Sequence, residues 1–150
     1  MKRKISKKGI EFIKKHEGCR LTACKADKSE KYYTIGYGHY SPNIVKGMKI
    51  TQEQAEEYLK KDIARFEKAV NDINELGMYG FGQAKFDALV SFAYNLGQGT
   101  LIQLTANGTR SDRVIYEKML QYNKCGGKVL KGLVKRREDE RKLFANGLYE

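Results

Sequence analysis

The chain has 150 residues and a formal net charge of +11, with 41% hydrophobic and 11% aromatic residues. This length suits one domain or two small lobes that share a core, and the hydrophobic content excludes a globally disordered chain. No run of about eighteen apolar residues occurs, so the sequence predicts no transmembrane helix. The basic N-terminus, MKRKISKKG, is followed by no apolar stretch. We therefore expect no secretory signal peptide, synthesis in the cytoplasm and release by another route.

The metal and redox chemistry that we expect is limited by the presence of only three cysteines (Cys19, Cys24 and Cys125) and two histidines. The cysteines are odd in number and lack the spacing of a zinc site, so we expect reduced, buried thiols without a disulfide framework. We also expect no metal ion and no cofactor. The positive charge favours polyanionic partners, namely nucleic acid, anionic lipid or the anionic polymers of bacterial walls, although basic runs are more often only solvated faces.

The first predicted element is a helix over residues 7–17. Ser6 is suited to its N-cap, and Gly18 stands where a left-handed residue commonly follows a helix. At about 100° per residue, Glu17 falls on the same apolar stripe as Ile13. Burial and the negative end of the helix dipole both disfavour the charged form, which predicts a raised pKa and a side chain able to donate a proton. The alternative is an acidic side chain that turns into solvent at a frayed helix end.

Three short strands are expected next. Residues 19–24 are mixed in composition, 26–31 (ADKSEK) indicate a polar turn, and 32–38 (YYTIGYG) are rich in aromatic and β-branched residues. Ser41-Pro42-Asn43 indicates another turn, and residues 44–50 are predicted to form the third strand. The sequence therefore predicts a small three-stranded antiparallel sheet.

A long helix follows the predicted sheet. Thr51 and Gln54 have the spacing of a capping box. The apolar stripe continues to about residue 76, which gives a helix of about 38 Å at a rise of 1.5 Å per residue. We expect a helix of this length to join two lobes. Asp62 falls inside its apolar stripe, and we expect His39 to pair with it in a buried, structural ion pair between the lobes.

The C-terminal half is predicted to be mainly helical. Residues 83–96 (QAKFDALVSFAYNL) have strong helical periodicity, whereas 98–110 are the least informative part of the chain and include TANGT, which is typical of a loop. Ser111 can cap a helix that ends at about residues 119–122. Gly126-Gly127 then breaks the chain, and a last helix is expected over residues 133–145.

Together these elements predict an α+β fold. Its expected parts are a sheet lobe at about 18–50, a linking helix at about 51–76, and a helical lobe at about 77–150 with helix 7–17 packed on it. Two lobes joined in this way predict a cleft between them, within a single domain that we expect to be a monomer.

Five short motifs follow one another along the chain. They are HEG followed by RL (16–21), TIGYGH (34–39), IT (50–51), FDALVSF with NLG (86–97), and GGKVL through RR (126–137). In this order they resemble the phage-type lysozymes of glycoside hydrolase family 24, over roughly residues 6–147. The resemblance implies a lysozyme-like fold and hydrolysis of the β-1,4 bond between N-acetylmuramic acid and N-acetylglucosamine. Peptidoglycan glycan strands, and no specific nucleic acid, are then the expected partner.

The catalytic pattern of that family is Glu, eight residues, Asp or Cys, five residues, then Thr. Glu17 and Thr34 match through their flanking motifs, but the position nine after Glu17 is Ala26, and the turn is two residues longer. Asp27 is the nearest carboxylate and the favoured second catalytic group. Glu30 could substitute for it, or the site could work without a second carboxylate. The resemblance assigns proton donation to Glu17, charge stabilisation or water activation to Asp27, and orientation of the water to Thr34.

Further side chains are implied to support the site. By resemblance, Arg136 is expected to supply a cation to Glu17, since one of the pair Arg136 and Arg137 should face outward. Such a salt bridge would lower the pKa of Glu17, in opposition to burial. Tyr94 and Asn95 are candidate sugar contacts at a helix end, and a core tyrosine and a plain helix-end asparagine are the equally open alternative.

Two other functions stay open. One is a lytic transglycosylase that cleaves the same bond through the sugar's own hydroxyl and needs no base. The other is a non-catalytic basic module that binds the bacterial wall or nucleic acid.

Overall fold

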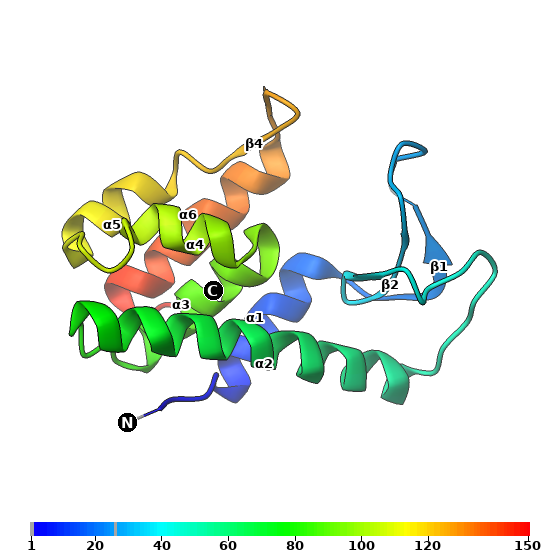
Figure 1. The fold of residues 1–150 in the computed structure, drawn as a ribbon, viewed down its shortest axis with the longest axis horizontal. Helices are drawn as coiled ribbons and strands as arrows, with labels where there is room; N and C mark the ends of the chain where they lie inside the picture. Colours follow the sequence, from blue (N-terminus) through cyan, green and yellow to red (C-terminus); the bar gives the residue numbers. More distant parts are fainter. Residues whose placement is uncertain (1, 26) are drawn as a thin grey trace. The chain divides into compact units, whose positions relative to one another are not determined.

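The computed structural model describes residues 2–25 and 27–150 (Figure 1). The helices are α1 (Lys7–Glu17), α2 (Gln52–Gly77), α3 (Gln83–Leu96), α4 (Gln98–Thr105), α5 (Asp112–Met119) and α6 (Lys131–Asn146). The strands are β1 (Arg20–Cys24), β2 (Tyr33–Gly36), β3 (His39–Ser41), β4 (Lys124–Cys125) and β5 (Lys128–Val129). The expected α+β class, with a small three-stranded antiparallel sheet, is confirmed.

The chain forms two compact units. Residues 13–64 make one, which we call the sheet unit, and residues up to Phe12 together with 65–150 make the other, the helical unit. The boundaries fall inside α1 and inside α2, so each of these two helices contributes a segment to both units.

The sheet has the strand order β1-β2-β3, and β2 and β3 form a tight hairpin. Ile35 pairs with His39, so only three residues close the turn. Gly36 and Gly38 have φ values of +65° and +83°, which L side chains rarely adopt. These two glycines therefore reverse the chain at the point where the sequence suggested a continuous strand.

The predicted position of the third strand was wrong for this reason. Because the hairpin turns early, the third strand is β3, and residues 44–50 lie outside the sheet apart from an isolated bridge between Lys49 and Thr22. The composition of YYTIGYG predicted one continuous strand, but the positive φ values of Gly36 and Gly38 make its second half the hairpin turn.

The predicted helix caps are confirmed. Ser6 Oγ accepts a hydrogen bond from the backbone N–H of Gly9 at 3.0 Å, and Gly18 has a φ of +66° after the end of α1. At the start of α2, Thr51 Oγ1 accepts from Gln54 N–H at 3.1 Å, and Gln54 Oε1 accepts from Thr51 N–H at 2.8 Å. This reciprocal pair satisfies donors that the first helical turn leaves without a helical partner.

In the helical unit, α3 packs mainly against α6, and its residues 86–93 are all buried. The predicted helix at 83–96 is confirmed, as is the cap of α5, where Ser111 Oγ accepts from Val114 N–H at 3.3 Å. The loop expected at TANGT is confirmed, because residues 106–109 form turns. The residues before it, for which the sequence gave no clear pattern, form α4 over 98–105, with Leu101 and Leu104 fully buried.

The break expected at Gly126-Gly127 is a two-residue hairpin turn between β4 and β5, with φ values of +58° and +81°. Figure 1 draws it as an orange loop next to the start of α6. All residues from 124 to 132 are exposed.

The expectation of buried thiols was wrong, because Cys19 and Cys125 are exposed and Cys24 is half-buried. Among residues 2–25 and 27–150, no group of three or more His, Cys, Asp or Glu side chains is placed to hold a metal ion. Within the same ranges, no helix combines the length and hydrophobicity needed to cross a bilayer.

Candidate active site

Glu17 is the last residue of α1 and is half-buried. The backbone N–H of Gly18 donates to Lys14 O at 2.9 Å, and the positive φ of Gly18 then turns the chain into β1. A Cβ atom at Gly18 would meet nothing within 4 Å, so glycine is needed here for its backbone angle and not for space. The glycine thus fixes the helix end, and with it the place of the Glu17 carboxyl.

Thr34 lies in the middle strand of the sheet and is half-buried. The register places it opposite Cys24 on one side and Tyr40 on the other. Residues directly opposite one another in antiparallel strands share a face of the sheet, and the neighbouring residue in the strand points to the other face. Since Ile35 is fully buried, Thr34 lies on the face opposite to the core-facing one.

Asp27 is fully exposed in the turn between β1 and β2. Its Oδ1 accepts from the backbone N–H of Ser29 at 2.9 Å, and this hydrogen bond, with a further one from the Ser29 side chain, lowers the pKa of Asp27 below its ordinary value of 3.8. The half-buried Glu30 closes the turn, because its Oε1 accepts from Asp27 N–H at 3.1 Å. Ala26, at the position that the family pattern gives to the acid, lies outside the described residues.

His39 and Asp62 form the predicted pair. His39 Nδ1 lies 2.8 Å from Asp62 Oδ2, and the His39 ring stacks on Tyr58 with 4.2 Å between centroids. The two side chains retain 19% and 11% of their exposure. Both residues belong to the sheet unit, so the pair ties β3 to α2 within that unit instead of bridging two lobes.

Sequence reasoning missed a polar cluster in the sheet unit. Lys14 Nζ lies 2.5 Å from Glu56 Oε1, and Gln52 Nε2 donates both to Glu56 Oε2 at 3.0 Å and to Tyr37 Oη at 2.9 Å. The lysine lowers the pKa of Glu56, and burial raises the pKa of the Tyr37 hydroxyl. The spacing of Gln52 and Glu56 on α2 was visible in the sequence, but their partners come from distant segments.

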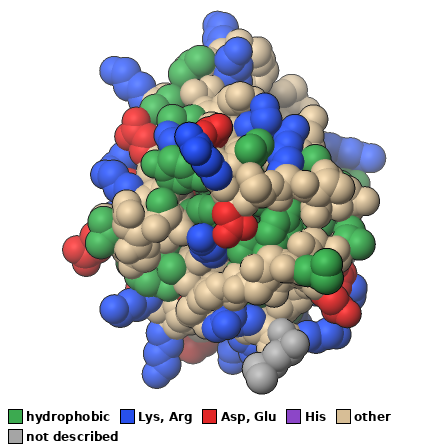
Figure 2. All heavy atoms as spheres, turned by 90° about the vertical axis from the view of Figure 1, so that its left-hand side faces the viewer, with side chains coloured by type: hydrophobic (Ala, Val, Ile, Leu, Met, Phe, Trp, Pro, Cys, Tyr) green, Lys and Arg blue, Asp and Glu red, His purple; other side chains and the backbone are tan. Residues whose placement is uncertain are grey.

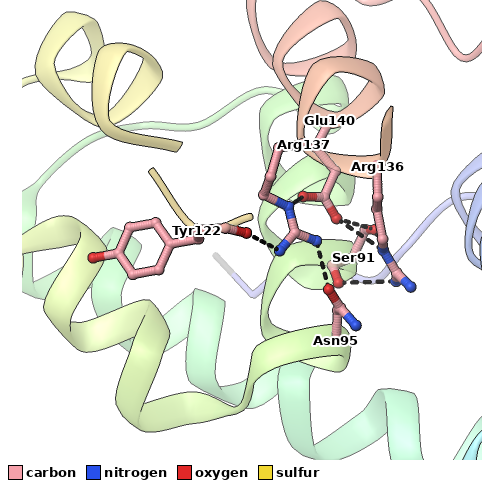
Figure 3. Close-up of polar contacts among 6 residues, drawn as sticks. All are labelled: Ser91, Asn95, Tyr122, Arg136, Arg137 and Glu140. Carbon is pink, nitrogen blue, oxygen red and sulfur yellow. Dashed lines mark hydrogen bonds and ion pairs between the residues drawn. The ribbon is translucent and has the colours of Figure 1, made fainter. Parts of the chain in front are cut away.

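Arg136 and Arg137 are both buried, with exposed fractions of 4% and 0%. The expectation that one of them faces outward was therefore wrong. The reason is Glu140, which lies three residues after one arginine and four after the other. Figure 3 shows its carboxylate serving both: Oε2 is 3.3 Å from Arg136 Nε, and Oε1 is 2.7 Å from Arg137 Nε. A carboxylate shared in this way lets two adjacent cations enter the interior.

Tyr94 and Asn95 are half-buried at the C-terminal end of α3, as expected from the sequence. The Tyr94 ring meets Phe66 edge to face, with centroids 5.7 Å apart. Asn95 Oδ1 accepts from Arg137 Nη2 at 2.7 Å. The structure therefore holds both side chains in place, and their role as sugar contacts stays a prediction.

A small antiparallel sheet, a helix-end glutamate and a helical unit built on α3 and α6 define a lysozyme-like protein. The chain belongs to the phage lysozyme family, whose sequence model matches residues 14–140 and so includes every candidate site residue.

Known phage endolysins are similar to this chain in sequence. The chain is 46% identical over 147 residues to the endolysin of Bacillus phage B103, which covers 95% of this chain and 54% of that protein. It thus spans about half the length of that relative. It is 36% identical to the endolysin of Acyrthosiphon pisum secondary endosymbiont phage 1, with 93% of this chain and 97% of that protein covered.

Solved structures share the fold. The endolysin from Escherichia coli O157:H7 phage FAHEc1 is similar with a TM-score of 0.83 and 34% identity, over 99% of this chain and 97% of that one. The muramidase domain of SpmX from Asticaccaulis excentricus is similar with a TM-score of 0.80 and 32% identity, over 96% of this chain and 99% of that one.

Proposed function

We propose that this chain is a muramidase that hydrolyses the β-1,4 bond between N-acetylmuramic acid and N-acetylglucosamine in bacterial peptidoglycan. The observation that carries the proposal is the match to the phage lysozyme family across residues 14–140, with Glu17 half-buried at the end of α1. A glutamate carboxyl at such a place is one of the side chains that can serve as general acid toward a glycosidic oxygen.

In this proposal, Glu17 protonates the leaving oxygen while positive charge develops on the sugar ring. Asp27 stabilises that charge or activates a water molecule, and Thr34 orients the water through its hydroxyl. The lowered pKa of Asp27 supports a role that requires an ionised carboxylate. If Asp27 acts as base, an inverting mechanism requires about 6.5–9.5 Å between the two carboxyl groups, whereas retention requires about 5 Å.

Glu30 is the alternative second carboxylate. It is half-buried where Asp27 is exposed, and its Oε1 already accepts a hydrogen bond inside the same turn. A site without any second carboxylate would instead suit a lytic transglycosylase, and the solvated position of Asp27 supports that second candidate function.

The supporting residues keep their proposed roles. Arg136 is the proposed source of a cation for Glu17, because it is a buried guanidinium already paired with Glu140 and an arginine fork can serve more than one carboxylate. Tyr94 and Asn95 are the proposed sugar contacts. His39 and Asp62 support the sheet unit, with no part in the chemistry.

Charge supports a polyanionic target for this activity. Lys and Arg side chains project around the face of the molecule seen in Figure 2, in keeping with the net charge of +11. We propose that this field draws a monomeric enzyme to the anionic bacterial wall, where it acts.

The test is a digest of purified peptidoglycan with mass analysis of the products, using Glu17→Gln as the inactive control. Hydrolysis gives new reducing ends, and a lytic transglycosylase gives 1,6-anhydro ends. If the wild-type chain yields neither product but still binds the wall or nucleic acid, the muramidase proposal is wrong and a binding module is the better description.

A further inference from the structure

The hairpin of β4 and β5 carries positive charge that no acidic side chain balances. Residues 118–137 contain no Asp or Glu. The lysines that belong to the hairpin or directly follow it are Lys124, Lys128 and Lys131. All three are exposed, and within residues 2–25 and 27–150 none of them forms an ion pair. Lys135, the next lysine along the chain, differs because its Nζ lies 2.9 Å from Asp139 Oδ1.

Two apolar side chains are exposed beside these lysines. Val129 is 57% exposed and Leu130 is 44% exposed. Val129 lies opposite Lys124 in the hairpin register, so these two side chains share a face. The backbone N–H of Leu130 donates to Asn123 O at 3.1 Å, which continues the pairing by one residue and puts Leu130 on the face of Lys128. Each face of the hairpin therefore presents a lysine next to an apolar side chain.

The rest of the described chain leaves this hairpin uncovered. Residues 124–132 are all exposed, and a Cβ atom added at Gly126 or Gly127 would meet no atom within 4 Å. Figure 1 shows the turn after β4 as an orange loop that extends away from the helices of its unit. Apolar side chains at such a place gain nothing from the core, so their contribution has to come from a partner.

We propose that this hairpin, residues 124–132, docks on an anionic lipid surface. Charge complementarity supports this partner, because anionic headgroups attract lysines close to the membrane. The apolar stem of a lysine lets its ammonium stay among the headgroups while Val129 and Leu130 enter the boundary of the acyl chains. A soluble polyanion would contact the lysines and leave both apolar side chains in water. A lipid surface is the partner that uses both kinds of side chain.

A single tryptophan tests the docking directly, because the chain contains none. We expect the emission of Val129→Trp to shift to shorter wavelength with vesicles of phosphatidylglycerol and phosphatidylcholine, since indole rings favour the membrane interface. Vesicles of phosphatidylcholine alone should give no shift. Val45→Trp is the matched control, because Val45 is 58% exposed and is followed by Lys46 but lies outside the hairpin. Its emission should not change with either vesicle.

Co-sedimentation with the same anionic vesicles measures what each side chain contributes. Lys128→Gln should weaken binding about fivefold, because it removes one lysine from the lipid surface. Val129→Ser should weaken binding roughly threefold through the lost apolar contact. The matched variants Lys46→Gln and Val45→Ser should each change binding by less than about twofold. All four substitutions replace exposed side chains, so the melting curves should match that of the wild type.

The outcomes separate this inference from simple attraction by net charge. A shift at Val129→Trp alone, with weaker binding only in the hairpin variants, supports the proposal. No shift at Val129→Trp, equal shifts at both tryptophans, or equal losses in the matched variants overturn it. If Lys128→Gln weakens binding of soluble polyphosphate while the Val129→Trp emission never shifts, the hairpin is a polyanion site instead. These measurements need no cleavage of peptidoglycan, so they hold whether or not the muramidase proposal does.

Discussion

Two aspartates, one in each unit, are used in opposite ways. In the helical unit, Asp87 is 1% exposed and accepts from the Ser6 backbone N–H at 3.2 Å, from Gln83 Nε2 at 2.7 Å, from Tyr149 Oη at 2.7 Å and from Ser6 Oγ. In the sheet unit, Asp27 is fully exposed, and its carboxylate accepts hydrogen bonds from Ser29 in its own turn.

This contrast distinguishes acids that hold segments of the chain together from acids that are proposed to take part in the reaction. Asp87 joins the segments next to both ends of the chain to α3, and Glu140 joins α6 to α3, so buried acids organise the helical unit. The candidate catalytic carboxylates of the sheet unit are half-buried or exposed, and a group that must exchange protons with substrate and water has to be reachable. We therefore expect substitutions at the candidate acids to affect activity, and substitutions at the buried acids to affect stability.

The largest expected effect is on activity, for Glu17→Gln. Removing the proposed general acid should slow clearing of a cell-wall suspension by at least a hundredfold, because general acid catalysis typically contributes a factor of about 10²–10⁴. The melting temperature should stay near the wild-type value, since the amide has nearly the same shape as the carboxyl. Full lytic activity in this variant would refute the assignment.

The largest expected effect on stability is for Glu140→Gln. This change leaves Arg136 and Arg137 buried without their shared carboxylate, and we expect the free energy of unfolding to fall by about 3–5 kcal/mol in urea titrations. Lys68→Ala is the control, because its pair with Asp72 spans 2.8 Å on side chains that are 74% and 50% exposed. That surface variant should differ from the wild type by less than about 0.5 kcal/mol.

A smaller loss of stability is expected for His39→Ala. The change removes the 2.8 Å contact to Asp62 and the stacking on Tyr58, and we expect a loss of about 1–3 kcal/mol. Lysis measured well below the melting temperature should fall much less than stability does. An unchanged melting curve would count against a structural role for the pair.

The smallest effect is expected for Asp27→Asn, with a loss of lytic rate of roughly tenfold, below that for Glu17. If only Glu30→Gln loses lytic rate, Glu30 is the second catalytic carboxylate. If both variants keep the full lytic rate, the reaction uses no second carboxylate.

The lowered pKa of Asp27 also sets a pH expectation. Its carboxylate stays ionised until the pH falls below 3.8, so the contribution of its Ser29 contact to stability is present above that value and is lost as the pH falls through the folded-state pKa. Asp27 should therefore not set the acid limb of the pH–rate profile above about pH 4. Disappearance of an acid limb above that pH in Asp27→Asn would contradict this expectation.

Local features were predictable because their causes lie within a few residues. Helix ends could be predicted from capping residues, namely Ser6, Gly18, and the pair of Thr51 and Gln54. Helix α3 could be predicted from the periodicity of residues 83–96. The pairing of His39 with Asp62 was found from a single polar residue on an apolar stripe. Such a residue needs a partner, and the chain has only two histidines.

The misses share a different cause. The third strand was misplaced because a glycine can break a strand or close a hairpin, and only its φ distinguishes the two. Residues 98–105 gave too weak a pattern to indicate α4, since its buried side chains are few and are covered by other segments.

The sequence by itself determined the fold class, most helix ends and the family to which the chain belongs. These features depend on the order of the motifs and on hydrogen bonds between residues that are close together in the sequence. Only the tertiary structure decided which charges are buried. Two adjacent arginines gave no sign that both lie in the interior, since that depends on Glu140 meeting Ser91 and on Asn95 meeting Arg137 across more than forty residues. Burial of a charge is a property of the partners that surround it, and those partners come together only when the helices pack.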